Sequence, residues 1–131
     1  MSTRRYIQIG GVINLLFVMF HLSFWKIFSW QQDLVKISAD NRAIMQVLNI
    51  HTAYVLLIFA ILSLVFSEEI VSSKLGRFIG LAVAAFWILR AINQIIFWGV
   101  AEVGSWVAFL VCLVISLLYI VPIFRLRRVQ P

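Results

Sequence analysis

The chain has 131 residues, of which 63% are hydrophobic and only 12% are charged, and its mean hydropathy is +1.04. A soluble domain of this size could not bury so much apolar surface, so the composition excludes a water-soluble fold and makes the lipid bilayer the solvent. The formal net charge of +6 does not indicate nucleic acid as a partner, because the basic residues lie in predicted loops and tails, where membrane topology places them.

Four stretches are long and apolar enough to cross a bilayer, which takes roughly 20 residues each. They cover residues 6–25, 43–66, 76–98 and 104–124. The first follows a basic start, but no A-x-A cleavage site follows it, so we interpret it as an uncleaved span. We therefore predict an all-α polytopic membrane protein, with residues 1–131 forming a single integral membrane domain folded as a four-transmembrane-helix antiparallel bundle.

The connection between the first two spans, residues 26–42, has its own pattern. It repeats apolar residues at helical spacing, with polar residues between them: Ile27, Trp30, Leu34 and Ile37. This periodicity predicts a short amphipathic helix lying on the membrane surface, and an ordinary loop is the alternative.

The orientation of the spans follows the positive charges, which gather on the cytoplasmic side of membranes. Seven basic residues fall on one predicted side: Arg4, Arg5, Lys74, Arg77, Arg125, Arg127 and Arg128. Three fall on the other: Lys26, Lys36 and Arg42. The asymmetry predicts a multi-pass protein of the cell membrane with both termini in the cytoplasm.

Polar residues interrupt three of the apolar spans at one depth. Counting inward from the span ends at about 1.5 Å per residue places six of them in one layer of the outer half of the membrane. They are His21, Asn49, His51, Arg90, Asn93 and Gln94. A charge at such a depth is costly, so Arg90 in particular marks a working site with a partner.

Helical spacing then selects the residues of one pocket. Arg90, Asn93 and Gln94 share a face of the third span, whereas His51 points about half a turn away from Asn49. We predict an aromatic-walled pocket that opens toward the outer leaflet and binds a small amphipathic or lipid-like molecule. Its residues are His21, Asn49, Arg90, Asn93 and Gln94, with Phe17, Phe86, Trp87 and Phe97 as walls.

The sequence leaves three possible roles for Arg90 open. Its long side chain could snorkel to the outer interface, it could pair with Glu102, or its forked guanidinium could contact the ligand. Asn93, Gln94 and Asn14 have the alternative role of hydrogen bonding between helices.

The sequence also leaves open whether the protein is an enzyme. If it is, His21 is the acid–base candidate and Arg90 would stabilise negative charge. We expect neither a metal site nor a cofactor. The alternative is a haem b whose iron is ligated by His21 and His51. Cys112 is the one cysteine, so an internal disulfide and a CxxC redox pair are excluded.

A second function class competes with ligand binding. In it the polar layer only joins the helices, and the protein is a structural or partner-binding membrane subunit. Gly76, Gly80 and Ala84 lie at i, i+4 and i+8, which would allow close contact inside the chain or in a homodimer. Apart from the lipid bilayer, the expected partners are an amphipathic small molecule and this second copy.

Overall fold

The structure, a computed structural model, describes residues 2–127. It is 90% helix, and the described residues contain no strand. Arg128, counted above among the cytoplasmic charges, lies outside the described residues. Four helices are long and apolar enough to cross a membrane. They are α1 (Thr3–Leu22), α4 (Ala39–Val65), α6 (Lys74–Trp98) and α7 (Val103–Arg127).

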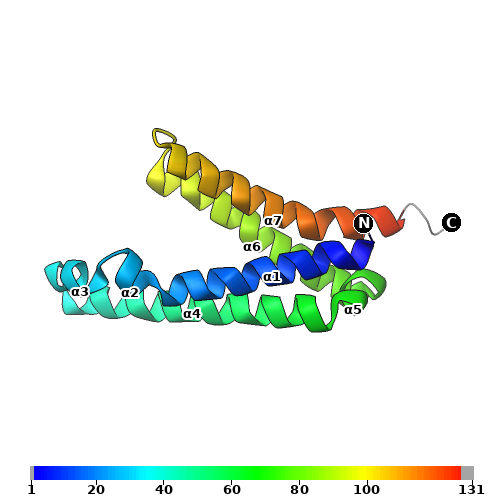
Figure 1. Ribbon diagram of the computed structural model, residues 1–131, viewed down its shortest axis with the longest axis horizontal. Helices are drawn as coiled ribbons and strands as arrows, with labels where there is room; N and C mark the ends of the chain where they lie inside the picture. Colours follow the sequence, from blue (N-terminus) through cyan, green and yellow to red (C-terminus); the bar gives the residue numbers. More distant parts are fainter. Residues whose placement is uncertain (1, 128–131) are drawn as a thin grey trace.

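The long helices form two hairpins. Helix α1 packs along α4, and α6 packs along α7. The two hairpins meet where α1 begins and α4 ends, and they diverge toward the opposite end of the molecule (Figure 1). We call these the α5 end and the α3 end, after the short helices that lie there. Because the hairpins diverge, the helices pack most closely at the α5 end.

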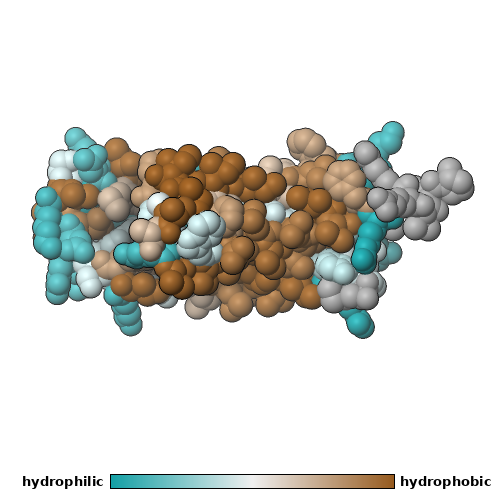
Figure 2. Space-filling model, turned by 90° about the horizontal axis from the view of Figure 1, so that it is seen from above, coloured by the Kyte–Doolittle hydropathy of each residue, from teal (hydrophilic) through white to brown (hydrophobic). Residues whose placement is uncertain are grey.

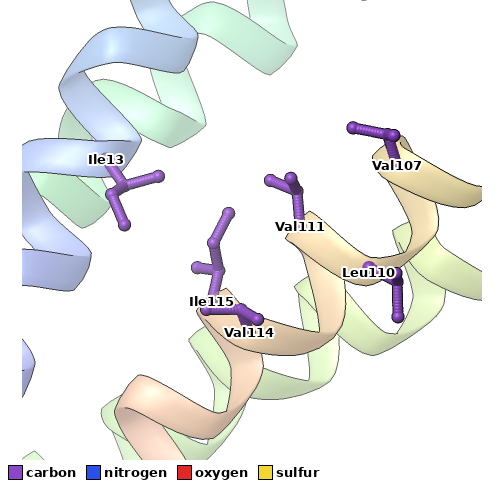
Figure 3. Close-up of a pocket in the computed structure, with 6 residues that line it drawn as sticks. All are labelled: Ile13, Val107, Leu110, Val111, Val114 and Ile115. Atoms are coloured by element: carbon purple, nitrogen blue, oxygen red, sulfur yellow. The ribbon is translucent and has the colours of Figure 1, made fainter. Parts of the chain in front are cut away.

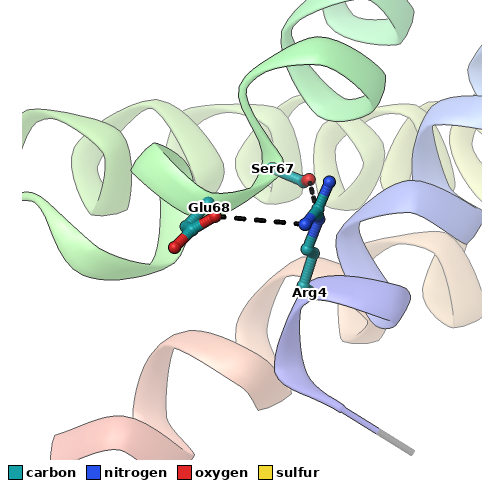
Figure 4. Close-up of polar contacts among 3 residues, drawn as sticks. All are labelled: Arg4, Ser67 and Glu68. Carbon is teal, nitrogen blue, oxygen red and sulfur yellow. Dashed lines mark hydrogen bonds and ion pairs between the residues drawn. The ribbon is translucent and has the colours of Figure 1, made fainter.

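Helix α5 (Ser67–Ser72) connects the two hairpins and packs on α6. Arg4 of α1 holds it from the other side, because its Nε donates a 3.1 Å hydrogen bond to Ser67 Oγ (Figure 4). The same guanidinium lies 4.0 Å from a carboxylate oxygen of Glu68. Both charged side chains are exposed, so the ion pair itself stabilises the fold little. The hydrogen bond to Ser67 fixes where α1 meets α5.

The connection between α1 and α4 is not one amphipathic helix. It consists of α2 (Phe24–Ile27), α3 (Trp30–Asp33) and the 3-10 turn η1 (Leu34–Lys36). Ser29 breaks the helical path with φ of 49°, a left-handed conformation that is uncommon for a residue with a side chain. The break turns Trp30 and Leu34 inward, where both are buried, while Ile27 stays exposed. Two of the four apolar residues that suggested a surface helix, Trp30 and Leu34, are therefore buried against the protein and do not face the membrane surface.

The surface of the molecule is apolar over its middle. Figure 2 shows a broad hydrophobic zone along the long helices, with hydrophilic side chains gathered at both ends. Large residues such as Leu16, Ile50 and Phe78 are more exposed than buried. In water such a surface would aggregate, whereas in hydrocarbon it is the expected exterior.

A polar network lies in the core where the hairpins meet. Asn14 Nδ2 donates 2.8 Å hydrogen bonds to Tyr119 Oη and to Gly10 O, and its Oδ1 accepts one from Trp87 Nε1 at 3.1 Å. Ser63 Oγ lies 2.7 Å from the same Tyr119 hydroxyl. The network takes one side chain from each of α1, α4, α6 and α7, and Asn14, Ser63 and Tyr119 are 0% exposed. It therefore joins the two hairpins inside an apolar core.

Small residues allow the closest helix contacts. Gly76, Gly80 and Ala84 are buried within the chain. A Cβ atom on Gly76 would overlap the backbone oxygen of Glu69, and one on Gly80 would lie 2.7 Å from Ile123 Cδ1. These residues therefore serve close packing against α5 and α7, and a homodimer through them would have to displace those helices.

Candidate functional site

His21 and Asn49 join α1 to α4 near the α3 end. His21 Nδ1 lies 2.7 Å from Asn49 Oδ1, and Asn49 Nδ2 donates a 3.0 Å hydrogen bond to the backbone oxygen of His21. The two contacts close a ring between the residues. Asn49 thus positions the imidazole, and the structure brings these two predicted site residues together.

This double contact determines which ring nitrogen of His21 is free. A backbone carbonyl only accepts, so the Asn49 atom facing it must be the amide nitrogen, and the atom facing the imidazole must be the amide oxygen. That oxygen also only accepts, so Nδ1 of His21 carries a hydrogen. In the neutral ring Nε2 then has its lone pair free. No hydrogen bond is assigned to Nε2 within residues 2–127.

Aromatic rings surround this histidine. His21 stacks on Phe24 at 4.5 Å between ring centroids, and it meets Phe20 edge to face at 5.9 Å. Phe17 lies one turn further into α1 and packs against Trp87 of the other hairpin at 4.8 Å. Phe24 belongs to the connection after α1. This segment therefore contributes an aromatic contact to His21 that residue spacing did not predict.

The three other predicted wall residues occupy different environments. Phe86 packs edge to face against Phe59 and Trp87, at 5.3 and 5.8 Å, between α4 and α6. Trp87 is buried, and its indole nitrogen belongs to the polar network at the hairpin junction. Phe97 is 74% exposed and has no ring contact among the described residues. Phe17 and Phe86 therefore lie between the hairpins, and Phe97 lies on the outer surface.

Arg90 is the most unusual polar residue of the site. Its Nη1 atom is buried without a hydrogen-bond partner, the single side-chain nitrogen or oxygen in that state within residues 2–127. The guanidinium carbon lies 5.2 Å from the Trp98 ring, a cation–π contact two turns along α6. Arg90 forms no ion pair with Glu102 or with any other described residue.

The two amides beside Arg90 differ in their surroundings. Gln94 is buried and donates a 3.3 Å hydrogen bond to Ser105 Oγ, which in turn donates to Gly99 O at 2.6 Å. Gln94 thus holds together the turn between α6 and α7. Asn93 is half-buried, and no hydrogen bond is assigned to its side chain in the described part of the chain.

The second histidine does not meet the first. His51 is exposed on α4, and its Nδ1 lies 2.9 Å from the backbone oxygen of Val47. Residues 2–127 contain no group of three or more His, Cys, Asp or Glu side chains that could hold a metal ion.

A surface groove of about 350 Å³ lies between α1 and α7. Figure 3 shows Ile13 of α1 opposite a row of aliphatic residues on α7. The lining is entirely apolar: Ile13, Val107, Leu110, Val111, Val114 and Ile115. His21 and Arg90 do not line it, so the polar residues and the hollow are neighbouring features rather than one pocket.

Sequence reasoning missed the partners of Asn14. Tyr119 and Ser63 carry the only hydroxyl groups bonded to one another in the described core, yet neither was selected as a candidate. Tyr119 lies within the most apolar span, and a buried tyrosine hydroxyl needs a hydrogen-bond partner, so its position could have indicated a polar contact there.

Comparison of the chain with protein-family models, with curated proteins and with solved structures found no match.

Proposed function

We propose that this chain is a multi-pass protein of the cell membrane that binds a small amphipathic molecule between its two hairpins. Its four long helices cross the bilayer as an antiparallel bundle, with both termini in the cytoplasm and the α3 end at the outer surface. The polar head of the ligand meets Arg90, and aromatic rings including Phe17 and Phe86 flank it. Four helices of sufficient length and hydropathy support the membrane assignment.

The unpartnered Nη1 of Arg90 carries this proposal. A buried guanidinium N–H without an acceptor costs free energy, and an internal ion pair or hydrogen bond would have removed that cost. The described residues supply neither. An acceptor oxygen on a ligand would satisfy the group, and a charge-assisted bond of this kind is among the stronger hydrogen bonds.

His21 adds a second recognition element to the same head group. With Nδ1 held by Asn49, its free Nε2 can accept a hydrogen bond from a ligand hydroxyl. If the bound molecule is chemically changed, the same atom is the one that would accept a proton. Asn49 is then a positioning residue, because it fixes the ring without contacting the ligand.

Native mass spectrometry of the full chain in mild detergent tests the proposal. We expect a retained small molecule in the wild type and its loss in Arg90→Met, which removes the guanidinium but keeps an unbranched apolar chain. Binding should weaken about tenfold or more, since a hydrogen bond to a charged group contributes about 1.5–3 kcal/mol. Arg77→Met, on the same helix near the α5 end, is the matched control and should retain the molecule. Equal retention in both variants would refute ligand binding at Arg90.

A structural role is the second candidate, and one observation favours it: the groove between α1 and α7 has no polar lining. In that case the polar residues only join helices, and the chain serves a larger assembly. Arg90→Met should then change the unfolding temperature without releasing any molecule. The haem alternative is tested in the same samples, because His21 and His51 ligation would give a Soret absorption band that His51→Ala abolishes.

A further inference from the structure

The groove between α1 and α7 lies at the depth of Arg90. Gln94 of α6 bonds to Ser105 of α7, so these two positions are level in the hairpin. The helices run in opposite directions, so moving four residues along each puts Arg90 level with position 109. That level falls between Val107 and Leu110, two residues that line the groove. At about 1.5 Å per residue, the Arg90 backbone is therefore level with the end of the groove that lies nearest the turn between α6 and α7.

Residues of α1, on the other side of the groove, lead to the same level along the helix axis. Trp87 Nε1 donates a hydrogen bond to Asn14 of α1, and the residue before it, Ile13, lines the groove. Arg90 lies three residues from Trp87 toward the α3 end, about 4.5 Å along the axis. The groove thus begins at the level of Arg90 along the helix axes and extends from there toward the α5 end.

We infer that the ligand is a single-chain anionic amphiphile, whose head binds Arg90 and whose hydrocarbon tail lies in the groove between α1 and α7. This inference rests on the proposed function and names the chemical class of its ligand.

The chemistry of Arg90 and the size of the groove select that class. A guanidinium binds carboxylate and phosphate oxygens through forked hydrogen bonds, so an anionic head complements it better than a neutral one. The groove volume of about 350 Å³ is near the lower end of the range for small-molecule pockets, which is roughly 300–1,000 Å³. That space suits one hydrocarbon chain rather than the two of a typical membrane phospholipid.

A second hollow extends the path of the tail. It has a volume of about 300 Å³ and is lined by Arg5, Gln8, Ile9, Val12 and Ile13. Ile13 lines both hollows, so they adjoin at this residue, and we place the end of a long tail in the second one. Long chains should therefore bind better than short ones.

Binding of defined probes to the full chain in detergent tests the chemical class. The probes are palmitate, hexadecyl phosphate, octanoate, the cation hexadecyltrimethylammonium and the two-chain lipid dipalmitoylphosphatidylglycerol. We expect palmitate or hexadecyl phosphate to bind more tightly than the other three, and the tighter of the two identifies a carboxylate or a phosphate head. Equal binding of the cation, or tighter binding of the two-chain lipid, would overturn the inference.

A bulky residue in the groove tests where the tail lies. Val114 and Leu117 are on the same helix and are 54% and 52% exposed, but only Val114 lines the groove. Val114→Trp should weaken palmitate binding about tenfold, because displacing two methylene groups from apolar contact has about that effect. Leu117→Trp should leave binding unchanged. Leu110→Trp, in the same groove, replaces Val114→Trp if that variant does not fold.

The two sets of variants separate the inference from the proposed function. If Arg90→Met releases the natural molecule while both groove variants bind palmitate normally, ligand binding at Arg90 stands and the tail site is wrong. If neither Arg90→Met nor the groove variants change binding, both proposals fail.

Discussion

Asn49 contacts His21 at two atoms, accepting from the ring nitrogen Nδ1 at 2.7 Å and donating to the backbone oxygen at 3.0 Å. A single hydrogen bond would leave the amide free to rotate by half a turn. The second bond removes that freedom, so the ring orientation and the protonated nitrogen are both determined by one side chain on the neighbouring helix. The Asn49 side-chain oxygen can only accept a hydrogen bond, so the hydrogen of the neutral imidazole must be on Nδ1. Its position can be measured by spectroscopy.

Nitrogen NMR of histidine-labelled protein in detergent should show the hydrogen of neutral His21 on Nδ1. His51 should show the same form, because its Nδ1 faces the backbone oxygen of Val47, and it serves as the internal reference. In Asn49→Ala we expect the His21 signals to change and those of His51 to stay. A hydrogen on Nε2 of His21 in the wild type would contradict the arrangement.

Removing the Tyr119 hydroxyl should destabilise the fold. Tyr119→Phe leaves Ser63 without its 2.7 Å partner and takes one acceptor from Asn14. Hydrogen bonds between membrane helices contribute about 0.6 kcal/mol on average and up to about 1.7 kcal/mol, so we expect a loss in that range. Reversible unfolding in mixed detergent micelles measures it. Tyr54→Phe, an exposed tyrosine on α4, is the control and should unfold like the wild type.

The junction between α5 and α6 should not accept a methyl group at Gly76. Its Cβ would overlap the backbone of Glu69, which cannot rotate away as a side chain can. We expect Gly76→Ala to cost about 1–3 kcal/mol of stability. Gly104→Ala is the contrast, since nothing lies within 4 Å of its added methyl, and the helix preference of alanine should stabilise α7 by up to about 1 kcal/mol. Thermal unfolding of the purified variants gives both values, and similar behaviour of the two would show that α5 is not held tightly against α6.

Cysteine labelling should establish the orientation of the chain in the membrane. In a background without the buried Cys112, Gln32→Cys lies in the connection after α1 and Ser72→Cys lies at the end of α5. Both positions are exposed, so a difference in labelling should reflect only the side of the membrane on which each one lies. We expect a membrane-impermeant maleimide to label position 32 in intact cells, and position 72 only after lysis. The reverse pattern would place the termini outside.

The positions of the four long helices could be predicted from the sequence because hydropathy alone defines them. The predicted stretch 76–98 corresponds to α6 and 104–124 to α7, each within a few residues. The stretch 26–42 was harder, because a break at Ser29 depends on a left-handed backbone that its own sequence does not require. Spacing that places residues on one face cannot tell whether that face meets lipid, water or protein.

The partners of the candidate site residues could not be predicted from the sequence. Spacing along α6 places Arg90 and Gln94 on one face, yet Gln94 turns to Ser105 while Arg90 extends to Trp98. Asn14 was recognised as a residue that could join helices, but its partners Tyr119 and Trp87 depend on which faces the two hairpins present to each other. That choice is made by packing between segments far apart in sequence.

The polar network has a consequence for synthesis of the chain. If the long helices enter a membrane in chain order, as we propose, Asn14 arrives with α1, when its one partner within that helix is Gly10. Trp87 follows 73 residues later and Tyr119 follows 105 residues later. With that order of insertion, the first hairpin keeps an incompletely bonded amide until α7 is inserted. A chain that stops before α7 would keep that amide exposed to lipid or to chaperones, so the cell's membrane quality control could recognise it as unfinished.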